Sequence, residues 1–486
     1  MAALTLSGLT GCKSRGGAAS RTVGASSGAR GVVVLDGKFS DWPAGVSTMA
    51  DADWVYFRVA VEGGGKPLQA ADTTLALWLD ADDNPATGAQ MPSPKVAAAI
   101  GVDLAVEFSP QDGAGRATPG IAVYAFGENG AKIGLNQAQL DLSSAPTTVA
   151  TDYEIRISRH PDATVAPVLS KLLGTAGHAR GMFVLIEKGK VVGWSDPVQF
   201  SIPALGAGKG KPVSEADLPQ KPAGAIRVLS YNVLKNSPEK NGNPFSRIFE
   251  ATRPDIILLQ EWDTNQATAQ AWFTAMVTGE ARWNAVIGEG GDVLIVSPYP
   301  IAPLTHGPVT AAGADKPVRF ASAVVKTPAG DVAVATVHLK CCGTVGSSED
   351  LKRIAEATAV QTALSSAMGN DGSRLRLITG DMNLVGSTTP LEKIAAGLDF
   401  DGSPLMAADP LVLGDGAEYT WSDEKEKFPP GRLDYVLYSD SQATVMNSFV
   451  LDTRRLGDRS LARMGLARTD SAASDHMPVV VDIKIK

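Results

Sequence analysis

The chain has 486 residues, of which 44% are hydrophobic and 20% charged, and its formal net charge is −8 at pH 7. This length predicts two or three globular domains, and the acidic balance excludes an overall basic field for gripping nucleic acid or an anionic membrane. Three cysteines exclude a disulfide framework or a thiolate zinc site, and the sequence has no run of 18 apolar residues that would predict a membrane-spanning helix.

The first 30 residues have the pattern of a bacterial lipoprotein. Residues 1–10 are apolar, and Leu9-Thr10-Gly11-Cys12 resembles a lipobox in which Cys12 would be acylated. We therefore predict a lipoprotein signal over 1–12, a flexible Gly/Ala/Ser-rich tether over 13–30, and a lipid-anchored location in the bacterial cell envelope, with the acyl anchor as the only membrane contact. No Lys or Arg precedes the apolar run, so a disordered N-terminus with an incidental cysteine is the alternative.

Residues 31–203 are predicted to form an all-β sandwich, because short β-branched and aromatic segments alternate there with turns. The predicted strands are 32–35, 54–61, 75–79, 100–108, 121–126, 153–158 and 182–188. The stretches 35–42 and 79–88 resemble signature segments of family-nine-type carbohydrate-binding modules. The resemblance implies a glycan partner, whereas Trp42, Trp54 and Trp78 could equally be core aromatics.

The turn after the third of these strands concentrates oxygen donors. Asp80, Asp82, Asp83 and Asn84 are residue types that Ca²⁺ prefers as ligands. The spacing lacks the glycine and the terminal glutamate of an EF-hand, and an Asp/Asn-rich turn is also stable without an ion. Calcium binding and a plain turn both remain open interpretations of this segment.

Residues 204–224 form a predicted Gly/Pro/Lys-rich linker, after which strands alternate with helices over 225–486. Apolar, strand-like runs occur at 226–229, 256–259, 332–339, 375–379, 434–438 and 479–485. Helical spacing occurs at 244–252, 268–278 and 348–368. In the last of these, Leu351, Ile354 and Leu364 are part of the predicted apolar face, and Ser347 supplies a cap. This alternation predicts a layered α/β sandwich.

Polar groups suited to a phosphate or a metal stand at the ends of six of these strands. Because ligands bind where strand ends converge in layered α/β folds, we expect them to form one site. Taken singly, His338 would be an ordinary core histidine and Asp434 a turn acid. The set comprises Asn232, Glu261, His338, Asp381 with Asn383, Asp434, and Asp475 with His476.

The motifs that carry these residues, in this order, resemble those of the endonuclease/exonuclease/phosphatase superfamily over 225–486. The quoted segments are Ser230-Tyr231-Asn232, Gln260-Glu261, Val337-His338-Leu339, Gly380-Asp381-Met382-Asn383, Leu433-Asp434-Tyr435 and Ser474-Asp475-His476. The resemblance implies an α+β domain built as a four-layer αββα sandwich, and a divalent cation, Mg²⁺ or Mn²⁺. It also implies that Glu261 is the principal metal ligand, with Asn232 and Asp475 beside it.

The same resemblance implies catalytic roles. Asp381 would orient or deprotonate the attacking water, and Asn383 would hold a phosphate oxygen. His476 would contact the scissile phosphate while Asp434 supports its imidazole. His338 would stabilise the developing negative charge or protonate the leaving oxygen.

Several further residues are left with two interpretations. Arg319 could clamp a phosphate or be a solvated strand-edge arginine, and Trp421 could pack on the substrate from its loop or simply cover that loop. Cys341 and Cys342 are either two packed thiols or a strained vicinal disulfide. Five arginines before the last motif could line a phosphate path or form a solvated face; they are Arg454, Arg455, Arg459, Arg463 and Arg468.

These observations predict an extracytoplasmic, metal-dependent enzyme that hydrolyses a phosphodiester, or a phosphomonoester, by in-line attack of water. A secreted or envelope endonuclease acting on DNA or RNA is the alternative enzyme. The alternative of another class is a lipid-anchored binding protein with an inactive hydrolase fold. The substrate and the oligomeric state do not follow from the sequence.

Overall fold

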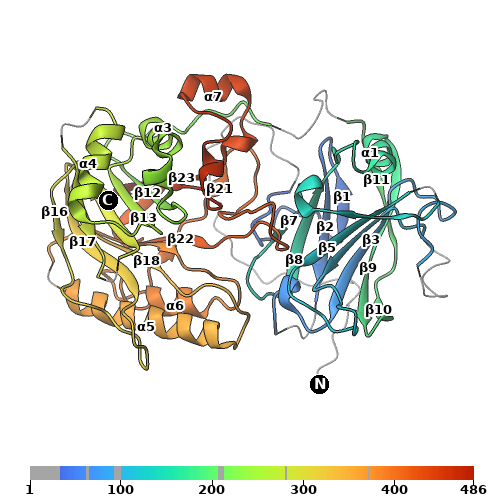
Figure 1. Ribbon diagram of the computed structural model, residues 1–486, viewed down its shortest axis with the longest axis horizontal. Helices are drawn as coiled ribbons and strands as arrows, with labels where there is room; N and C mark the ends of the chain where they lie inside the picture. The colour runs from blue at the N-terminus through green and yellow to red at the C-terminus, as the bar shows by residue number, and fades with distance from the viewer. Residues whose placement is uncertain are drawn as a thin grey trace. The chain divides into compact units, whose positions relative to one another are not determined.

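The computed structural model describes residues 33–61, 65–91, 100–127, 129–205, 213–279, 282–289, 291–369 and 371–486. It divides into two units, drawn in Figure 1. The first combines the described part of Arg30–Pro212 with Asp423–Gly431, and the second combines Val213–Ser422 with Arg432–Lys486. The predicted signal, the tether and Cys12 lie outside the described residues. Within the described ranges, no helix has the length and hydropathy needed to cross a membrane.

The first unit contains two antiparallel sheets with the strand orders β1-β2-β8-β7 and β10-β9-β3-β4-β5-β6, and β11 also pairs with β9. Their bounds are β1 Thr48–Ala50, β2 Trp54–Ala60, β3 Thr74–Asp80, β4 Leu104–Phe108, β5 Ile121–Phe126, β6 Lys132–Leu135, β7 Ser143–Ala145, β8 Asp152–Ser158, β9 Gly177–Glu187, β10 Lys190–Trp194 and β11 Val198–Ile202. One apolar core joins the two sheets, so the predicted all-β sandwich is confirmed.

Side-chain alternation explains this core. In β2, Val55, Phe57 and Val59 point to the same face and are buried with Leu77 of β3. Trp42, Trp54 and Trp78 are at most 7% exposed, which makes them core aromatics, and β10 carries the exposed Trp194. The unit also holds a helix that the sequence did not predict, α1 (Pro167–Gly174), with two short 3-10 turns, η1 (Leu68–Ala70) and η2 (Gln137–Gln139).

The second unit contains two mixed sheets with the strand orders β14-β15-β13-β12-β24-β23-β21 and β16-β17-β18-β19-β22-β20. The first sheet has β12 Ile226–Asn232, β13 Ile256–Gln260, β14 Asn284–Ile287, β15 Val293–Ser297, β21 Leu411–Val412, β23 Ala443–Val450 and β24 Val479–Ile485. The second has β16 Ile301–Pro303, β17 Arg319–Thr327, β18 Gly330–His338, β19 Leu375–Asp381, β20 Met406–Ala407 and β22 Asp434–Tyr438.

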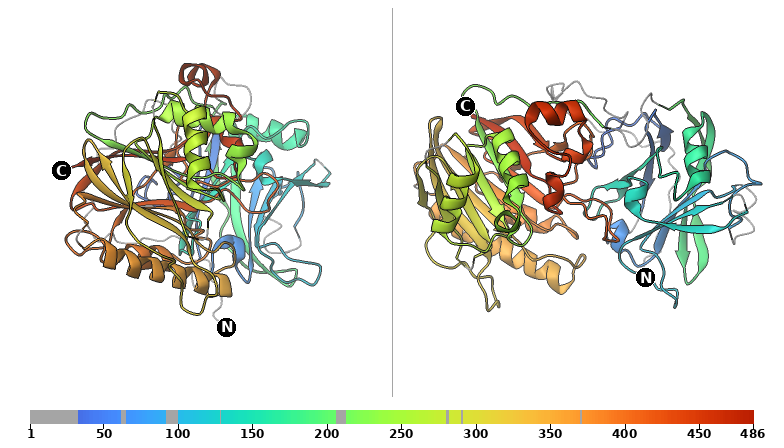
Figure 2. Two further views of the ribbon diagram at one scale, coloured as in Figure 1. Left: turned by 60° about the vertical axis from the view of Figure 1, so that its left-hand side comes forward. Right: turned by 45° about the horizontal axis from the view of Figure 1, so that its top comes forward.

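Helices cover the outer faces of both sheets (Figures 1 and 2). α3 (Gly242–Thr252) and α4 (Gln266–Met276) share an apolar core with the first sheet. α5 (Ser348–Ala367) and α6 (Thr389–Ala395) share another with the second sheet. The two sheets pack on each other through β12, β13 and β15 on one side and β17, β18 and β19 on the other. The predicted four-layer αββα sandwich is therefore confirmed. The remaining elements are α2 Ser237–Lys240, η3 Thr453–Arg455, α7 Asp458–Met464 and η4 Ser471–Ala473.

The buried face of α5 differs from the predicted one. Leu351 is 60% exposed, whereas Arg353, Ala357 and Val360 are buried. The guanidinium of Arg353 donates hydrogen bonds to the backbone oxygens of Lys340 and Cys342. The apolar pattern places Arg353 on the solvent side of the helix. These hydrogen bonds allow its guanidinium to be buried instead, so the helix is rotated relative to the predicted orientation.

A buried ion pair joins the loops of the second unit. The carboxylate of Asp452 is fully buried and accepts from Arg454 Nε at 2.8 Å and from the hydroxyl of Tyr419 at 2.9 Å. Arg455 pairs with Asp415, and Arg463 and Arg468 pair with Asp217 and Asp458. Four of the five arginines of the predicted phosphate path are thus already paired with carboxylates.

Replacing Asp452 by Asn is expected to destabilise the second unit by about 2–3 kcal/mol at pH 7, because it removes the charge of a fully buried carboxylate that pairs with the partly buried Arg454. Burial alone would raise the pKa of Asp452, but Arg454 lowers it to about 2. Because this lies below the unfolded value of about 3.9, the stabilisation is complete above that value and is lost as the pH falls through about 2. Urea unfolding should separate the variant from wild type at neutral pH and show them converging near pH 2. Asp217→Asn, which removes an exposed partner, should change the midpoint little at either pH.

Candidate active site

Alternation along the strands brings the predicted polar residues to the inner faces of the two sheets. In β12, Leu229 and Tyr231 face the helices, and Asn232 therefore faces the second sheet. Across the sheets, Gln260 donates to the hydroxyl of Thr336 at 2.8 Å. The same alternation turns His338 of β18 inward, because Val337 lies in the outer core.

Three of these residues lie side by side in one sheet. His338 is paired with Asp381 in the parallel β18–β19 ladder, and Asp381 with Asp434 in the antiparallel β19–β22 ladder. Gly380 permits the close approach of β18 and β19, because a Cβ on it would lie 2.0 Å from the carbonyl oxygen of Val337. The register of the sheet thus places an imidazole and two carboxylates next to one another.

Asp381 is the centre of the site. Its Oδ2 lies 3.1 Å from Asn232 Nδ2, 3.5 Å from His338 Nε2 and 3.7 Å from His476 Nε2. The residue is 1% exposed. Burial raises the pKa of Asp381, although the two imidazoles and the Asn232 amide oppose the shift. Asp381 is therefore a buried carboxylate with an increased affinity for a proton.

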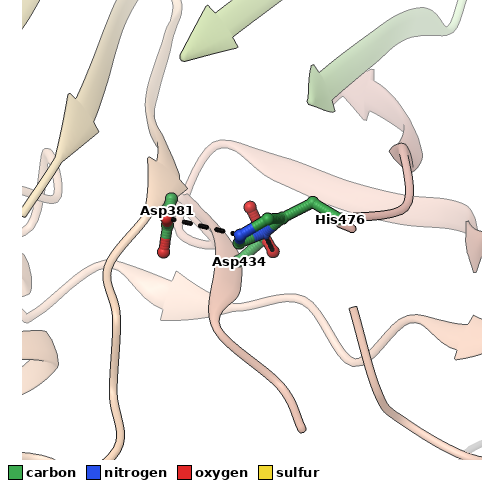
Figure 3. Close-up of side chains that lie close together, drawn as sticks. All are labelled: Asp381, Asp434 and His476. Carbon is green, nitrogen blue, oxygen red and sulfur yellow. Dashed lines mark hydrogen bonds and ion pairs between the residues drawn. The ribbon is translucent and has the colours of Figure 1, made fainter. Parts of the chain in front are cut away.

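His476 lies between two carboxylates (Figure 3). Its Nδ1 is 2.8 Å from Asp434 Oδ2, and its Nε2 faces Asp381. Burial lowers the pKa of His476, but Asp434 and Asp381 outweigh burial and raise it to about 10. The hydroxyl of Thr420 donates to Asp434 Oδ2 at 2.6 Å and accepts from the backbone N–H of Leu433. The two carboxylates therefore favour the cationic form of the imidazole and hold its orientation.

A second acid–histidine pair lies on the other side of Asp381. His338 Nδ1 is 2.6 Å from Asp292 Oδ2, which the sequence did not single out. Arg319 is the cross-strand neighbour of His338, and its Nη1 lies 2.8 Å from the same ring nitrogen. Burial opposes the charge of Asp292, but His338 and Arg319 lower its pKa. In the sequence, the one feature that could have pointed to Asp292 is its position directly before the apolar run of β15, which makes it a polar strand end.

The other predicted ligands surround this centre. Glu261 adopts the left-handed backbone region with φ of +61°, which is unusual for a residue with a side chain. Its carboxylate accepts from Asn232 Nδ2 and from the backbone N–H of Lys235, each at 3.1 Å. Asp475 accepts from the indole N–H of Trp421 at 3.1 Å. Trp421 thus contacts a predicted metal ligand as well as the strand end of His476.

A family model matches this part of the chain. The model of the endonuclease/exonuclease/phosphatase family covers residues 229–476. The chain belongs to the endonuclease/exonuclease/phosphatase family. Members of this family are phosphoester hydrolases, generally metal-dependent. No curated protein matched the chain.

Solved structures of similar proteins cover the same half of the chain. A 3′ phosphatase from Neisseria is 20% identical, with a TM-score of 0.38, over 53% of this chain and 98% of that one. Sphingomyelinase C from Streptomyces griseocarneus is 18% identical, with a TM-score of 0.36, over 53% and 99%. An AP endonuclease from Archaeoglobus fulgidus is 12% identical, with a TM-score of 0.35, over 53% and 98%.

The site residues fit the divalent cation that this family generally uses. Five carboxylates (Glu261, Asp292, Asp381, Asp434 and Asp475) gather around two histidines and Arg319, so negative charge is in excess. Glu261 and Asp475 have no lysine or arginine partner among the described residues. Hard oxygen donors with surplus negative charge suit Mg²⁺ or Mn²⁺. Within the same site, Asp381, Asp434 and His476 have ligand atoms within 4.8 Å of one another, but Asp434 already holds the imidazole of His476.

The residues that remain are Asn383, Arg319 and the two cysteines, whose contacts are with other groups of the protein. Asn383 donates to the backbone oxygen of Leu339 at 3.2 Å, beside the centre. Arg319 donates to the same oxygen at 2.9 Å, so its guanidinium holds the end of β18. Cys341 and Cys342 are free thiols with their sulfurs 2.8 Å apart; burial and Cys341 raise the pKa of Cys342 to about 11.

Proposed function

We propose that the chain is a divalent-metal-dependent phosphodiesterase that cleaves its substrate by in-line attack of water. The observation that carries the proposal is the position of Asp381 between two imidazoles, each with a carboxylate of its own. Such an arrangement offers one group to take a proton and two to give a proton or stabilise charge.

Asp381 takes the proton of the attacking water in this proposal. Burial favours its protonated form, which makes it a better base than an exposed aspartate. As the water oxygen bonds to phosphorus, its proton moves to the Asp381 carboxylate and the bond to the leaving oxygen breaks. Asn232 Nδ2, at 3.1 Å, keeps the carboxylate in place.

The two histidines then have different tasks. His476, held cationic by Asp434, donates from Nε2 to a phosphate oxygen and stabilises its negative charge. His338 uses its Nε2 to return a proton to the leaving oxygen, while Asp292 fixes the opposite ring nitrogen. Asn232, Glu261 and Asp475 would hold the metal ion, which withdraws charge from the phosphoryl oxygens when bound.

Hydrolysis of bis(p-nitrophenyl) phosphate tests the proposal. We expect release of p-nitrophenolate with Mg²⁺ or Mn²⁺ and none after chelation, and we expect p-nitrophenyl phosphate, a monoester, to be the poorer substrate. Plasmid DNA, RNA, phospholipids and sugar phosphates then distinguish substrate classes, and nicking of the plasmid would identify a nuclease. Wild-type protein that hydrolyses no phosphoester with any divalent ion would show a binding protein on an inactive hydrolase fold.

Thr420 is expected to be a positioning residue for the Asp434–His476 pair. Thr420→Val keeps the shape but removes the hydroxyl, so Asp434 loses a 2.6 Å hydrogen bond and two backbone N–H groups lose their acceptor. We expect kcat to fall about 10- to 100-fold, the equivalent of about 1–3 kcal/mol, with KM unchanged. Thr420→Ser should restore most of kcat. Equal kcat values for the valine and serine variants would contradict the role.

We also propose that the enzyme resides in the cell envelope through an acyl chain on Cys12, on the strength of the lipobox pattern alone. Cys12→Ser should move the protein from the membrane to the soluble fraction. A variant that sediments with membranes as the wild type does would defeat this proposal. Glycan binding by the first unit stays a prediction that rests on the resemblance of 35–42 and 79–88 to carbohydrate-binding modules; Trp42, Trp54 and Trp78 are buried.

A further inference from the structure

Three carboxylates meet at one end of the first unit, in a place that phosphoester hydrolysis does not use. Asp80 ends β3, Asp82 follows in the turn, and Asp103 precedes β4. Each offers an oxygen within 4.8 Å of the oxygens of the other two. Asp80 is 0% and Asp103 1% exposed, and Asp82 is partly buried. Residues from two separate segments therefore bury like charges together.

The described residues supply no ion-pair partner for this charge. Among the described residues, none of the three carboxylates forms an ion pair, whereas the neighbouring Asp83 pairs with Arg180 at 2.8 Å. Burial is the largest cause that raises the pKa of Asp80 to about 6 and that of Asp103 to about 7, and the nearby carboxylates raise both further. Burying a charged acidic group without a counter-ion raises the free energy of the folded protein, because the charge loses its hydration and gains no ionic partner.

One carboxylate oxygen of the cluster accepts no hydrogen bond from the described residues. Asp80 accepts from the backbone N–H groups of Asn84 and Gly101, and Asp103 Oδ2 accepts from the N–H of Ala81 at 2.8 Å. Asp103 Oδ1 accepts no hydrogen bond from the described residues. Gly88 closes over this oxygen, since a Cβ there would lie 2.9 Å from it, and its φ of +67° favours glycine. The oxygen without a hydrogen bond therefore belongs to a carboxylate that is 1% exposed, beside a position where the backbone leaves no room for a Cβ.

We propose that Asp80, Asp82 and Asp103 bind Ca²⁺. Ca²⁺ bonds to oxygen at about 2.4 Å, so one ion can bridge oxygens up to 4.8 Å apart. It tolerates irregular coordination by carboxylates from separate segments, whereas Mg²⁺ requires a near-ideal octahedron. The bound ion ties the turn 80–88 to the start of β4. This site differs from the predicted set, since Asp83 pairs with Arg180 and Asn84 accepts from the N–H of Ala86.

The first test measures Ca²⁺ binding to the full chain. After chelation, equilibrium dialysis against Ca²⁺ with excess Mg²⁺, followed by elemental analysis, gives the bound equivalents. We expect one Ca²⁺ in the wild type and in Asp83→Asn, the matched control. Glu261→Gln should also retain it, which separates this site from the hydrolase. Asp103→Asn should weaken binding about tenfold or more, because it removes a charged ligand.

The second test measures the urea midpoint of unfolding with and without Ca²⁺. Only a calcium site predicts that the order of wild type and variant depends on the ion. Without Ca²⁺, Asp103→Asn should unfold at a higher urea concentration than the wild type, because it removes an uncompensated buried charge. With Ca²⁺ the order should reverse, because only the wild type gains binding energy. If Asp103→Asn does not fold, Asp82→Asn, whose side chain is partly exposed, carries both tests.

Three results would overturn the proposal. Wild-type protein that neither binds Ca²⁺ nor gains stability from it has no such site. Asp103→Asn and Asp82→Asn variants that bind Ca²⁺ as the wild type does would place the ion elsewhere. Binding of Mg²⁺ as tight as that of Ca²⁺ would remove the assignment to calcium. Phosphodiesterase activity should be the same in wild type and Asp103→Asn, so the outcome is independent of the proposed hydrolysis.

Discussion

An Asp381→Asn variant should retain the fold and lose about 10³-fold in kcat on bis(p-nitrophenyl) phosphate, the range expected for the loss of a general base. The amide keeps the shape and can still contact His338 and His476, but it cannot accept the proton of water. Because burial disfavours the charged form of Asp381 in the folded protein, the neutral variant should be at least as stable as the wild type in chelator. Paired kcat and urea-midpoint measurements check both statements.

Asp331→Asn is the matched control, because Asp331 lies in the neighbouring strand and, among the described residues, forms an ion pair only with the surface residue Lys326. Its kcat should equal that of the wild type. A kcat of Asp381→Asn within about tenfold of wild type would assign the base elsewhere, and a lowered urea midpoint would instead indicate a structural role.

The second large effect is expected for Glu261→Gln, and it should appear as a change in the Mg²⁺ concentration that the activity requires. Glu261 is the predicted principal ligand and has no lysine or arginine partner within ion-pair distance among the described residues. Removing its charge should raise the Mg²⁺ concentration for half-maximal activity by about 100-fold and lower kcat at saturation. Titration of Mg²⁺ at fixed substrate measures both.

Asp263→Asn provides the control two residues away, since this carboxylate is exposed. It should leave the Mg²⁺ titration unchanged. Unchanged half-activation in Glu261→Gln would show that Glu261 does not hold the ion. A loss of kcat without a shift in half-activation would give Glu261 a role in substrate binding instead.

The strand ends were predictable because their chemistry is local. An apolar run that stops at a polar residue is visible in the sequence around Asn232, His338 and Asp381, and alternation determines which side chains share a face. The β-sandwich followed from the same kind of pattern. These features depend on neighbours in the chain.

Partners from distant segments were not predictable in this way. Asp292 supports His338 from a turn whose one sequence signal, a polar residue before an apolar strand, does not identify its partner, and Asp103 joins Asp80 only after β3 and β4 pair. Asp83 has the residue type of a metal ligand in the sequence, but in the structure it forms an ion pair with Arg180 of β9. The rotation of α5 likewise depends on Arg353, whose carbonyl partners lie on a preceding loop. Tertiary hydrogen bonds and ion pairs decided each case.

The ladder register of His338, Asp381 and Asp434 has a consequence for how this site could change. Because backbone hydrogen bonds between adjacent strands fix the spacing of the three residues, the connections 339–374 and 382–433 contribute little to it. Insertions or deletions in those connections could reshape what approaches the phosphate while the reacting groups stay in place. New substrate preferences could therefore arise by exchanging loop segments that leave Thr420 in place, without a change in the spacing of these three residues.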